Sequence, residues 1–190
     1  MDTDIAGPEI DELLRRYENW RWICNYAGNA PWDPPDRENG RLYFRYGYPH
    51  PDWWAYIIEA GLNGSYQVLY ASTERRTTPA ESVQGIFSRF EDAGKFIIYK
   101  VGTYLRSAHR MEMIGPKWRA AGLDPRVETE VESDQVVKYV LRNDPDAYFV
   151  MTLGDMPYSH LLPMSYDELD AVLLEGFPES VTSRQDVGRG

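Results

Sequence analysis

The chain has 190 residues, 43% of them hydrophobic and 26% charged, which is the composition of a folded globular protein. Its net charge of −10 and pI near 4.8 disfavour binding to nucleic acid or to an anionic membrane, and favour a basic partner. No run of about 18 apolar residues occurs, and the acidic N-terminus is unlike a secretory signal. We therefore expect a cytoplasmic protein with one domain over residues 1–180 and a mobile tail over residues 181–190.

The first predicted element is a helix that begins near Pro8. Apolar residues such as Leu13 and Tyr17 recur at helical spacing, and proline suits the first turn of a helix. Residues 25–40 contain three prolines and two glycines, so they predict a loop. Trp32 in this loop either folds back onto the core or belongs to an exposed contact arm.

Three antiparallel strands follow, over residues 41–48, 53–60 and 65–72. The Asn63-Gly64 pair between the last two favours a hairpin turn. Trp53 and Trp54 are adjacent, so they must point to opposite faces of their strand. One face should meet a helix layer, and the other is covered by more protein or forms a binding surface.

The second half of the chain predicts helices on either side of a group of strands. Thr78, Pro79 and Glu81 form a helix-start signal, which predicts a helix over residues 77–90. The periodicity of residues 96–106 fits a helix or a strand, and we expect a helix. The strands are expected over residues 126–132, 136–142 and 147–153, with a possible fourth over residues 159–164, and the last helix over residues 166–177. This order predicts an α+β fold, with mostly antiparallel sheet packed against a long central helix and with N- and C-terminal helices.

The usual signatures of enzymes and metal sites do not occur in the sequence. Phosphate-loop, dinucleotide-binding, zinc-protease and nucleophile-elbow motifs are absent. His50, His109 and His160 lie in distant segments, so we predict no metal, no cofactor and no catalytic site. Acidic pairs that could act as general acid and base are expected to be solvated instead; they are Asp144 with Asp146, and Asp167 with Asp170. An enzyme that uses His109 or His160 with an acid stays as an alternative.

Aromatic residues make up 14% of the chain and concentrate around the first three strands. Tryptophan and tyrosine combine a large contact area with a polar group, so they serve both cores and protein interfaces. An aromatic patch rimmed by carboxylates would need a partner. The candidate partner-binding residues are Trp32, Asp33, Asp36, Tyr48, Trp53, Trp54 and Tyr56.

Residues 87–106, FSRFEDAGKFIIYKVGTYLR, resemble the central helix of a family of bacterial immunity proteins. The matching positions are an aromatic run, a glycine and a leucine before an arginine, namely Phe96, Tyr99, Gly102, Leu105 and Arg106. The family includes the antitoxin of the tuberculosis necrotizing toxin. The resemblance extends over residues 40–178, and the loop at residues 29–40 departs from it.

The resemblance implies a cytoplasmic protein that binds one secreted toxin domain before export, covers the toxin's active site and performs no chemistry. The best-known target of the family hydrolyses NAD. A secretion chaperone or another accessory binding protein would share the same sequence features, and rescue from toxicity would distinguish the two roles.

Overall fold

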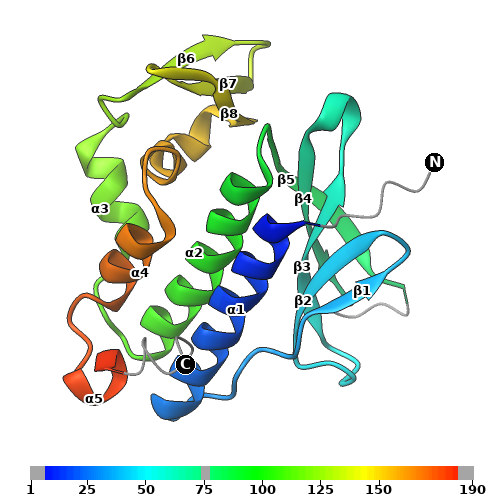
Figure 1. The fold of residues 1–190 in the computed structure, drawn as a ribbon, viewed down its shortest axis with the longest axis vertical. Helices are drawn as coiled ribbons and strands as arrows, with labels where there is room; N and C mark the ends of the chain where they lie inside the picture. Colours follow the sequence, from blue (N-terminus) through cyan, green and yellow to red (C-terminus); the bar gives the residue numbers. More distant parts are fainter. Residues whose placement is uncertain (1–6, 74–77, 184–190) are drawn as a thin grey trace.

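The computed structural model describes residues 7–73 and 78–183. In those ranges the chain forms one sheet with helices packed against it, and none of the helices has the length and apolarity needed to cross a membrane (Figure 1). The elements in chain order are α1 (Pro8–Tyr26), β1 (Asp36–Glu38), β2 (Arg41–Tyr46), β3 (Trp54–Ala60), the 3₁₀ helix η1 (Leu62–Gly64), β4 (Tyr66–Ser72), β5 (Ala80–Phe87), α2 (Phe90–Ala108), α3 (Ile114–Ala121), β6 (Val127–Val131), β7 (Val136–Leu141), β8 (Asp144–Thr152), the 3₁₀ helix η2 (Leu153–Leu161), α4 (Tyr166–Leu174) and α5 (Glu179–Thr182).

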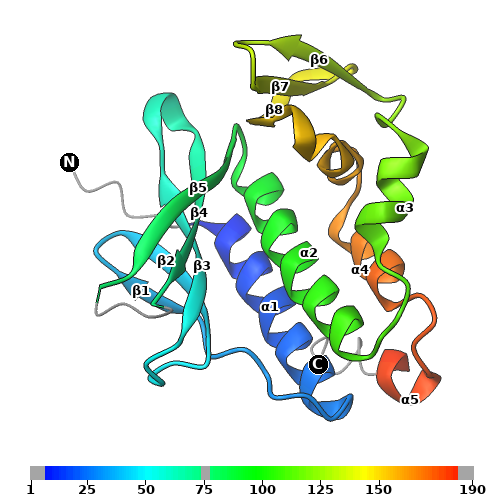
Figure 2. The same ribbon diagram turned by 180° about the vertical axis from the view of Figure 1, so that it is seen from behind.

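The sheet has the strand order β1-β2-β3-β4-β5-β8-β7-β6, and every neighbouring pair is antiparallel. β5 and β8 pair through only two residue pairs, Ile86 with Val150 and Phe87 with Phe149. This narrow connection divides the sheet into a first half, β1–β5, and a second half, β6–β8, which lie apart in both ribbon views (Figure 2). The predicted α+β fold with antiparallel sheet is confirmed.

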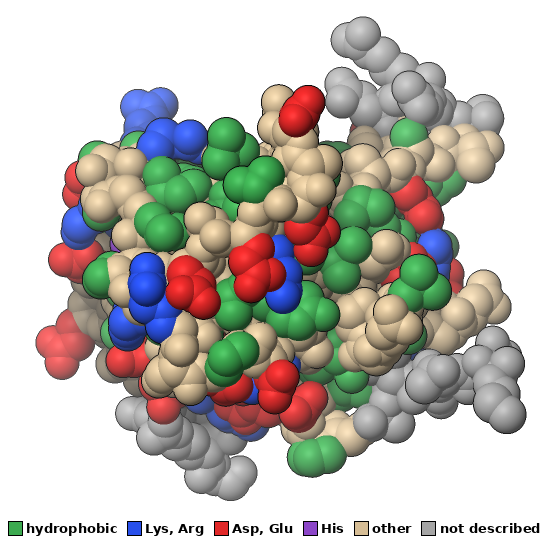
Figure 3. Space-filling view, turned by 90° about the horizontal axis from the view of Figure 1, so that it is seen from above, with side chains coloured by type: hydrophobic (Ala, Val, Ile, Leu, Met, Phe, Trp, Pro, Cys, Tyr) green, Lys and Arg blue, Asp and Glu red, His purple; other side chains and the backbone are tan. Residues whose placement is uncertain are grey.

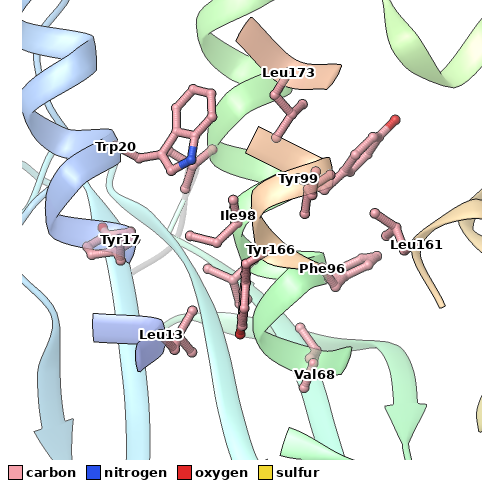
Figure 4. Close-up of a cluster of buried hydrophobic side chains, with 14 of the residues drawn as sticks. Leu13, Tyr17, Trp20, Val68, Phe96, Ile98, Tyr99, Leu161, Tyr166 and Leu173 are labelled. Atoms are coloured by element: carbon pink, nitrogen blue, oxygen red, sulfur yellow. The ribbon is translucent and has the colours of Figure 1, made fainter. Parts of the chain in front are cut away.

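Helix α2 is the predicted central helix, and α1 and α4 pack against it. Side chains from α1, α2, β4, η2 and α4 meet in one cluster (Figure 4). Gly102 allows α4 to approach α2 closely, because a Cβ at this position would lie 2.7 Å from a methyl carbon of Leu173. The missing side chain at Gly102 therefore leaves the space that Leu173 of the last large helix occupies.

The predicted helix over residues 77–90 is wrong for residues 78–89, and residue 77 lies outside the described residues. Residues Ala80–Phe87 form β5, which pairs with β4 from Tyr66↔Phe87 to Ser72↔Ala80. A capping signal is local, and pairing along a whole neighbouring strand overrides it. The helix starts further on, at Phe90, where Glu91 and Asp92 occupy the first turn.

Three other details differ from the sequence prediction. Residues 159–164 do not add a strand, because they end the 3₁₀ helix η2 and bury Leu161 and Leu162 against the core. α3 is not among the predicted helices; it contains Gly115 and Pro116 in its first turn, where proline is tolerated. Of the predicted tail, residues 184–190 lie outside the described residues, and Val181 is buried.

The prediction that Asp170 is solvated is also wrong. Asp170 is 2% exposed and accepts hydrogen bonds from the Trp20 indole and the Arg16 guanidinium, each at 2.7 Å. Burial raises the pKa of Asp170 more than these two donors lower it. α4 turns this side of its surface toward α1, a contact that helical spacing alone does not reveal.

Candidate functional site

The side of β2–β4 that faces away from the helices carries a small apolar cluster of its own. Its buried members are Ala55, Ile57, Leu69 and Ala71. Arg41 of β2 forms ion pairs with Glu59 of β3 at 2.6 Å and with Glu81 of β5 at 3.0 Å. β3 and β4 separate β2 from β5, so the second ion pair requires the sheet to curl over this cluster. We call this the outer side of the sheet.

Next to this cluster, Arg45 lies among aromatic rings. Its guanidinium carbon is 4.3 Å from the ring centre of Tyr43, 5.0 Å from that of Tyr48 and 5.6 Å from that of Trp53. Its terminal nitrogens donate to Asp36 and Glu38 of β1, each at 2.8 Å. These six residues, Asp36, Glu38, Tyr43, Arg45, Tyr48 and Trp53, are called the Arg45 surface below.

In the Arg45 surface a buried guanidinium forms ion pairs with two half-exposed carboxylates. Arg45 is 6% exposed, whereas the side chains of Asp36 and Glu38 are 53% and 47% exposed. Burial by itself lowers the pKa of Arg45, but hydrogen bonds to Glu38 and Asp36 outweigh it, so the net pKa is raised. The hydrogen bond with Arg45 is the main reason that the pKa of Asp36 lies below its ordinary value. The guanidinium is therefore permanently charged.

The loop before β1 fixes the position of Tyr48. The Asp33 carboxylate accepts a hydrogen bond from the main-chain N–H of Tyr48 at 2.8 Å, and the Asp33 N–H donates to the Arg45 carbonyl at 3.0 Å. Gly47 takes a φ of 81°, which a residue with a side chain rarely adopts, and so allows the chain to turn out of β2. Tyr48 is 52% exposed at this turn. The loop thus presents an aromatic ring on a defined backbone.

The structure separates the predicted partner-binding residues into two groups. Asp36, Tyr48 and Trp53 belong to the Arg45 surface, and Asp33 supports it through the backbone. The remaining three, Trp32, Trp54 and Tyr56, lie on the helix-facing side of the sheet. The prediction that Trp53 and Trp54 point to opposite faces is confirmed, because they join different clusters.

Trp32 serves the core in this structure and not an exposed contact arm. It is 0% exposed, and its ring lies 4.6 Å from Trp54 and 5.7 Å from Tyr46. The ring centre of Tyr104 of α2 lies 5.9 Å from that of Trp32. A fully buried indole has no surface to offer a partner, so this member of the predicted set is a structural residue here.

Lys100 of α2 is a second cation among aromatic rings, on the helix-facing side. Its amino group is 4.7 Å from the ring centre of Phe96 and 4.8 Å from that of Tyr158, and it donates to the Tyr158 hydroxyl at 2.7 Å. Among the described residues no carboxylate lies within ion-pair distance of it. Burial lowers the pKa of Lys100 to about 8.

The three histidines remain in separate surroundings. His160 stacks on Trp118 with ring centres 5.4 Å apart and contacts the Asp124 carboxylate at 3.4 Å. His50 lies in the exposed turn after β2, and His109 follows α2 beside Phe177. Within residues 7–73 and 78–183, no three His, Cys, Asp or Glu side chains gather closely enough to hold a metal ion.

Sequence reasoning missed Arg45, Tyr43 and Glu38 as members of the site. The alternation in RLYFRYGY does put Tyr43 and Arg45 on one face of their strand. The pairing of Glu38 with Arg45 depends on β1, which pairs with β2 but lies inside the segment predicted as loop. The signal that could have identified this site is Arg45 itself, a charged residue between aromatic residues of its strand.

The fold and the site define an α+β protein with an aromatic, acid-rimmed surface on the outer side of its sheet. No protein-family model matches the chain, and no curated protein sequence matches it. Among solved structures the chain is similar to Rv3902c from M. tuberculosis, with a TM-score of 0.56 and 14% sequence identity. The match covers 83% of this chain and 87% of that chain. At this identity the likeness shows a shared fold.

Proposed function

We propose that this chain is a non-catalytic immunity protein that neutralises a secreted toxin by covering the toxin's active site. The observation that carries the proposal is the Arg45 surface. A buried guanidinium holds Tyr43 and Trp53 in place, and the ring of Tyr48 stays half exposed beside them. Aromatic side chains that are already ordered lose little conformational freedom on binding, which makes them effective interface residues.

The charge of the surface supports a partner with a cationic site. Asp36 and Glu38 leave about half of their side-chain surface in solvent, on a chain with a net charge of −10. NAD is an anionic dinucleotide, so an enzyme that hydrolyses it presents cationic groups in its active site. An acidic surface would be attracted to that site, and the attraction would speed association at low salt. The resemblance of residues 87–106 supports this toxin class.

In this role the protein acts in the cytoplasm, binds one toxin domain per chain and carries out no reaction. The direct test uses the toxin domain encoded next to this gene. Both proteins are co-expressed, cellular NAD is measured, and the complex is sized by light scattering after gel filtration. We expect NAD to be preserved and a 1:1 complex to form. The proposal is contradicted if the product of the neighbouring gene does not bind this protein, or if it still consumes NAD when bound.

Two variants test whether the toxin contacts the Arg45 surface. Tyr48→Ala and Asp36→Lys are expected to weaken the complex at least about tenfold, as is common for central interface residues. Tyr26→Ala on α1 is the matched control, because Tyr26 is 47% exposed and lies outside the Arg45 surface. Equal affinities for the Tyr48 and Tyr26 variants would show that the toxin binds elsewhere. A complex that forms without rescue would favour the secretion-chaperone role.

A further inference from the structure

The two edges of the sheet differ in how well they are protected against pairing with another strand. The β1 edge is three residues long and follows Pro34 and Pro35, which cannot donate ladder hydrogen bonds. The β6 edge is five residues long, Val127–Val131, with no proline and no bulge in its pairing with β7. It is the outermost strand at its end of the sheet (Figure 1). The second edge is therefore open to strand addition.

The hydrogen-bond pattern identifies which groups of β6 face outward. The Arg142 N–H donates to the Arg126 carbonyl, and the Glu132 N–H donates to the Val136 carbonyl. Hydrogen-bonded pairs alternate along an antiparallel ladder, so Glu128 and Glu130 also turn their main-chain groups toward β7. The N–H and C=O groups of Thr129 and Val131 must then point away from the sheet, where a further strand would pair with them.

The side chains of β6 indicate which sequence an added strand would need in order to pair with this edge. Glu128 and Glu130 lie on one face and keep 49% and 57% of their side-chain surface exposed, although they contact Arg142 and Lys138 of the β7 side. Val131 lies on the other face and is 75% exposed. At this end of the molecule acidic, basic and hydrophobic side chains are interleaved on the surface (Figure 3). A complementary strand would carry basic residues at alternate positions and apolar residues between them.

A second copy of this chain does not fit the same edge. The Val127 N–H is already bonded to the Asp124 carbonyl, so two β6 strands that pair antiparallel must match the outward-facing Thr129 and Val131 with each other. Every register that pairs these two residues places Glu128 or Glu130 of one strand opposite a glutamate of the other strand. Like charges directly opposite each other destabilise a strand pair. The acidic edge thus selects against self-association and for a basic partner.

We propose that β6 is a second binding surface, which adds an extended segment of a partner protein with alternating basic and apolar residues as a ninth strand of the sheet. The proposal stands on the edge geometry and does not depend on toxin neutralisation by the Arg45 surface. Strand addition of this kind draws its affinity from main-chain hydrogen bonds and its specificity from alternate side chains.

The probe is the peptide acetyl-Lys-Val-Lys-Val-Lys-Val-Lys-amide, added to the whole protein while amide hydrogen exchange is followed by NMR. At a peptide concentration of ten times Kd, exchange at Thr129 and Val131 should slow by about tenfold, because only the free protein exchanges these amides. The control peptide has the same charge but is N-methylated at every residue, so neither edge of its backbone can donate hydrogen bonds to β6. Equal protection by both peptides, or none by the first, would overturn the proposal.

The matched variant is Thr129→Pro. The Thr129 N–H points outward, so proline at this position leaves the β6–β7 ladder intact and blocks an added strand. We expect this variant to keep the wild-type NMR spectrum outside β6 and to lose the peptide-induced protection at Val131. Glu128→Lys should weaken the response to the lysine peptide several-fold. Concentration-dependent dimerisation that Thr129→Pro abolishes would show that the edge is taken by a second copy, and would overturn the proposal.

Discussion

Arg45 and Lys100 are both cations among aromatic rings, but they lie on opposite sides of the first half of the sheet. Arg45 has two carboxylate partners, and its pKa is raised. Lys100 contacts rings and a tyrosine hydroxyl, and burial lowers its pKa to about 8. Rings and one hydroxyl do not offset the cost of burying the Lys100 ammonium group, whereas two carboxylates outweigh the cost of burying the Arg45 guanidinium.

This difference between Arg45 and Lys100 indicates that the two sides of the sheet have different roles. The helix-facing side is a core in which Trp32, Tyr56 and Phe96 exclude water, and a charge there opposes folding. The outer side is held by ion pairs that solvent partly reaches, so its rings are ordered and still accessible. The outer side is therefore the better candidate for binding, and the helix-facing side the larger contributor to stability.

The largest expected effect is loss of stability in Trp32→Ala. Removing this fully buried indole should lower the free energy of unfolding by about 3–5 kcal/mol, because it deletes ring contacts and leaves a cavity. Urea denaturation followed by circular dichroism measures the change. Trp22→Ala is the control, since Trp22 is 53% exposed, and should alter stability by no more than about 0.5 kcal/mol. Equal losses would contradict the assignment of Trp32 to the core.

The next effect is a gain of stability in Lys100→Met. The folded pKa of about 8 is below the ordinary value of 10.5, so the unfolded chain binds more protons between these values. The free energy of unfolding of the native protein should therefore rise as pH increases from 8 to 10.5. Below pH 8 the full cost of burying the charged Lys100 amino group remains. A shift of this size corresponds to at most about 3 kcal/mol. Loss of the cation–ring contacts reduces the gain, so we expect about 1–2 kcal/mol at pH 7.

Denaturation at pH 7 and pH 10 checks the Lys100 prediction. The advantage of Lys100→Met should shrink at the higher pH, because the native lysine is then largely neutral. Lys117→Met is the control, since the Lys117 side chain is 55% exposed, and it should show no such pH dependence. A variant less stable than the native protein at both pH values would mean that the lysine stabilises the fold.

A smaller effect is expected in Arg41→Ala on the outer side. The side chains of Arg41 and Glu59 are 30% and 22% exposed, so solvent screens their ion pair only in part. We expect a loss of about 1 kcal/mol, which should decrease when the salt concentration is raised. Arg15→Ala removes a more exposed pair with Glu12 on α1 and should cost less. A loss that does not change with salt would assign the effect to packing of the Arg41 side chain and not to its ion pairs.

The smallest effect is a change in the titration of Asp36. Its folded pKa is lowered mainly by the hydrogen bond with Arg45, so its contribution to stability is present above the unfolded pKa and is lost as pH falls through the folded pKa. In Arg45→Leu the Asp36 pKa should move up toward 3.8, as followed by carbon NMR of the carboxylate. Arg41→Leu should leave the Asp36 titration unchanged. An unchanged Asp36 pKa in Arg45→Leu would contradict the proposed electrostatics.

Much of the fold follows from the sequence alone. Periodic apolar residues predicted the first helix, a capping box predicted the last large helix, and strand alternation predicted that Trp53 and Trp54 face opposite sides of the sheet. The central helix was expected, although periodicity there also fitted a strand. Such patterns reflect how a single element buries one of its faces, which is a local property of the chain. The same locality explains the error at residues 77–90, where a good capping sequence lies in a strand.

Tertiary structure decided which residues meet. The burial of Trp32, the ion pairs of Arg41 across two strands and the contact of Asp170 with α1 all depend on pairing between distant segments. The Arg45 surface likewise requires the β1–β2 hairpin to bring Glu38 to Arg45. The sequence supplied the aromatic and charged residues and their alternation, whereas the curl of the sheet and the packing of α1 and α4 on α2 determined which became core and which became surface. Those contacts join residues far apart in the chain, so no local pattern records them.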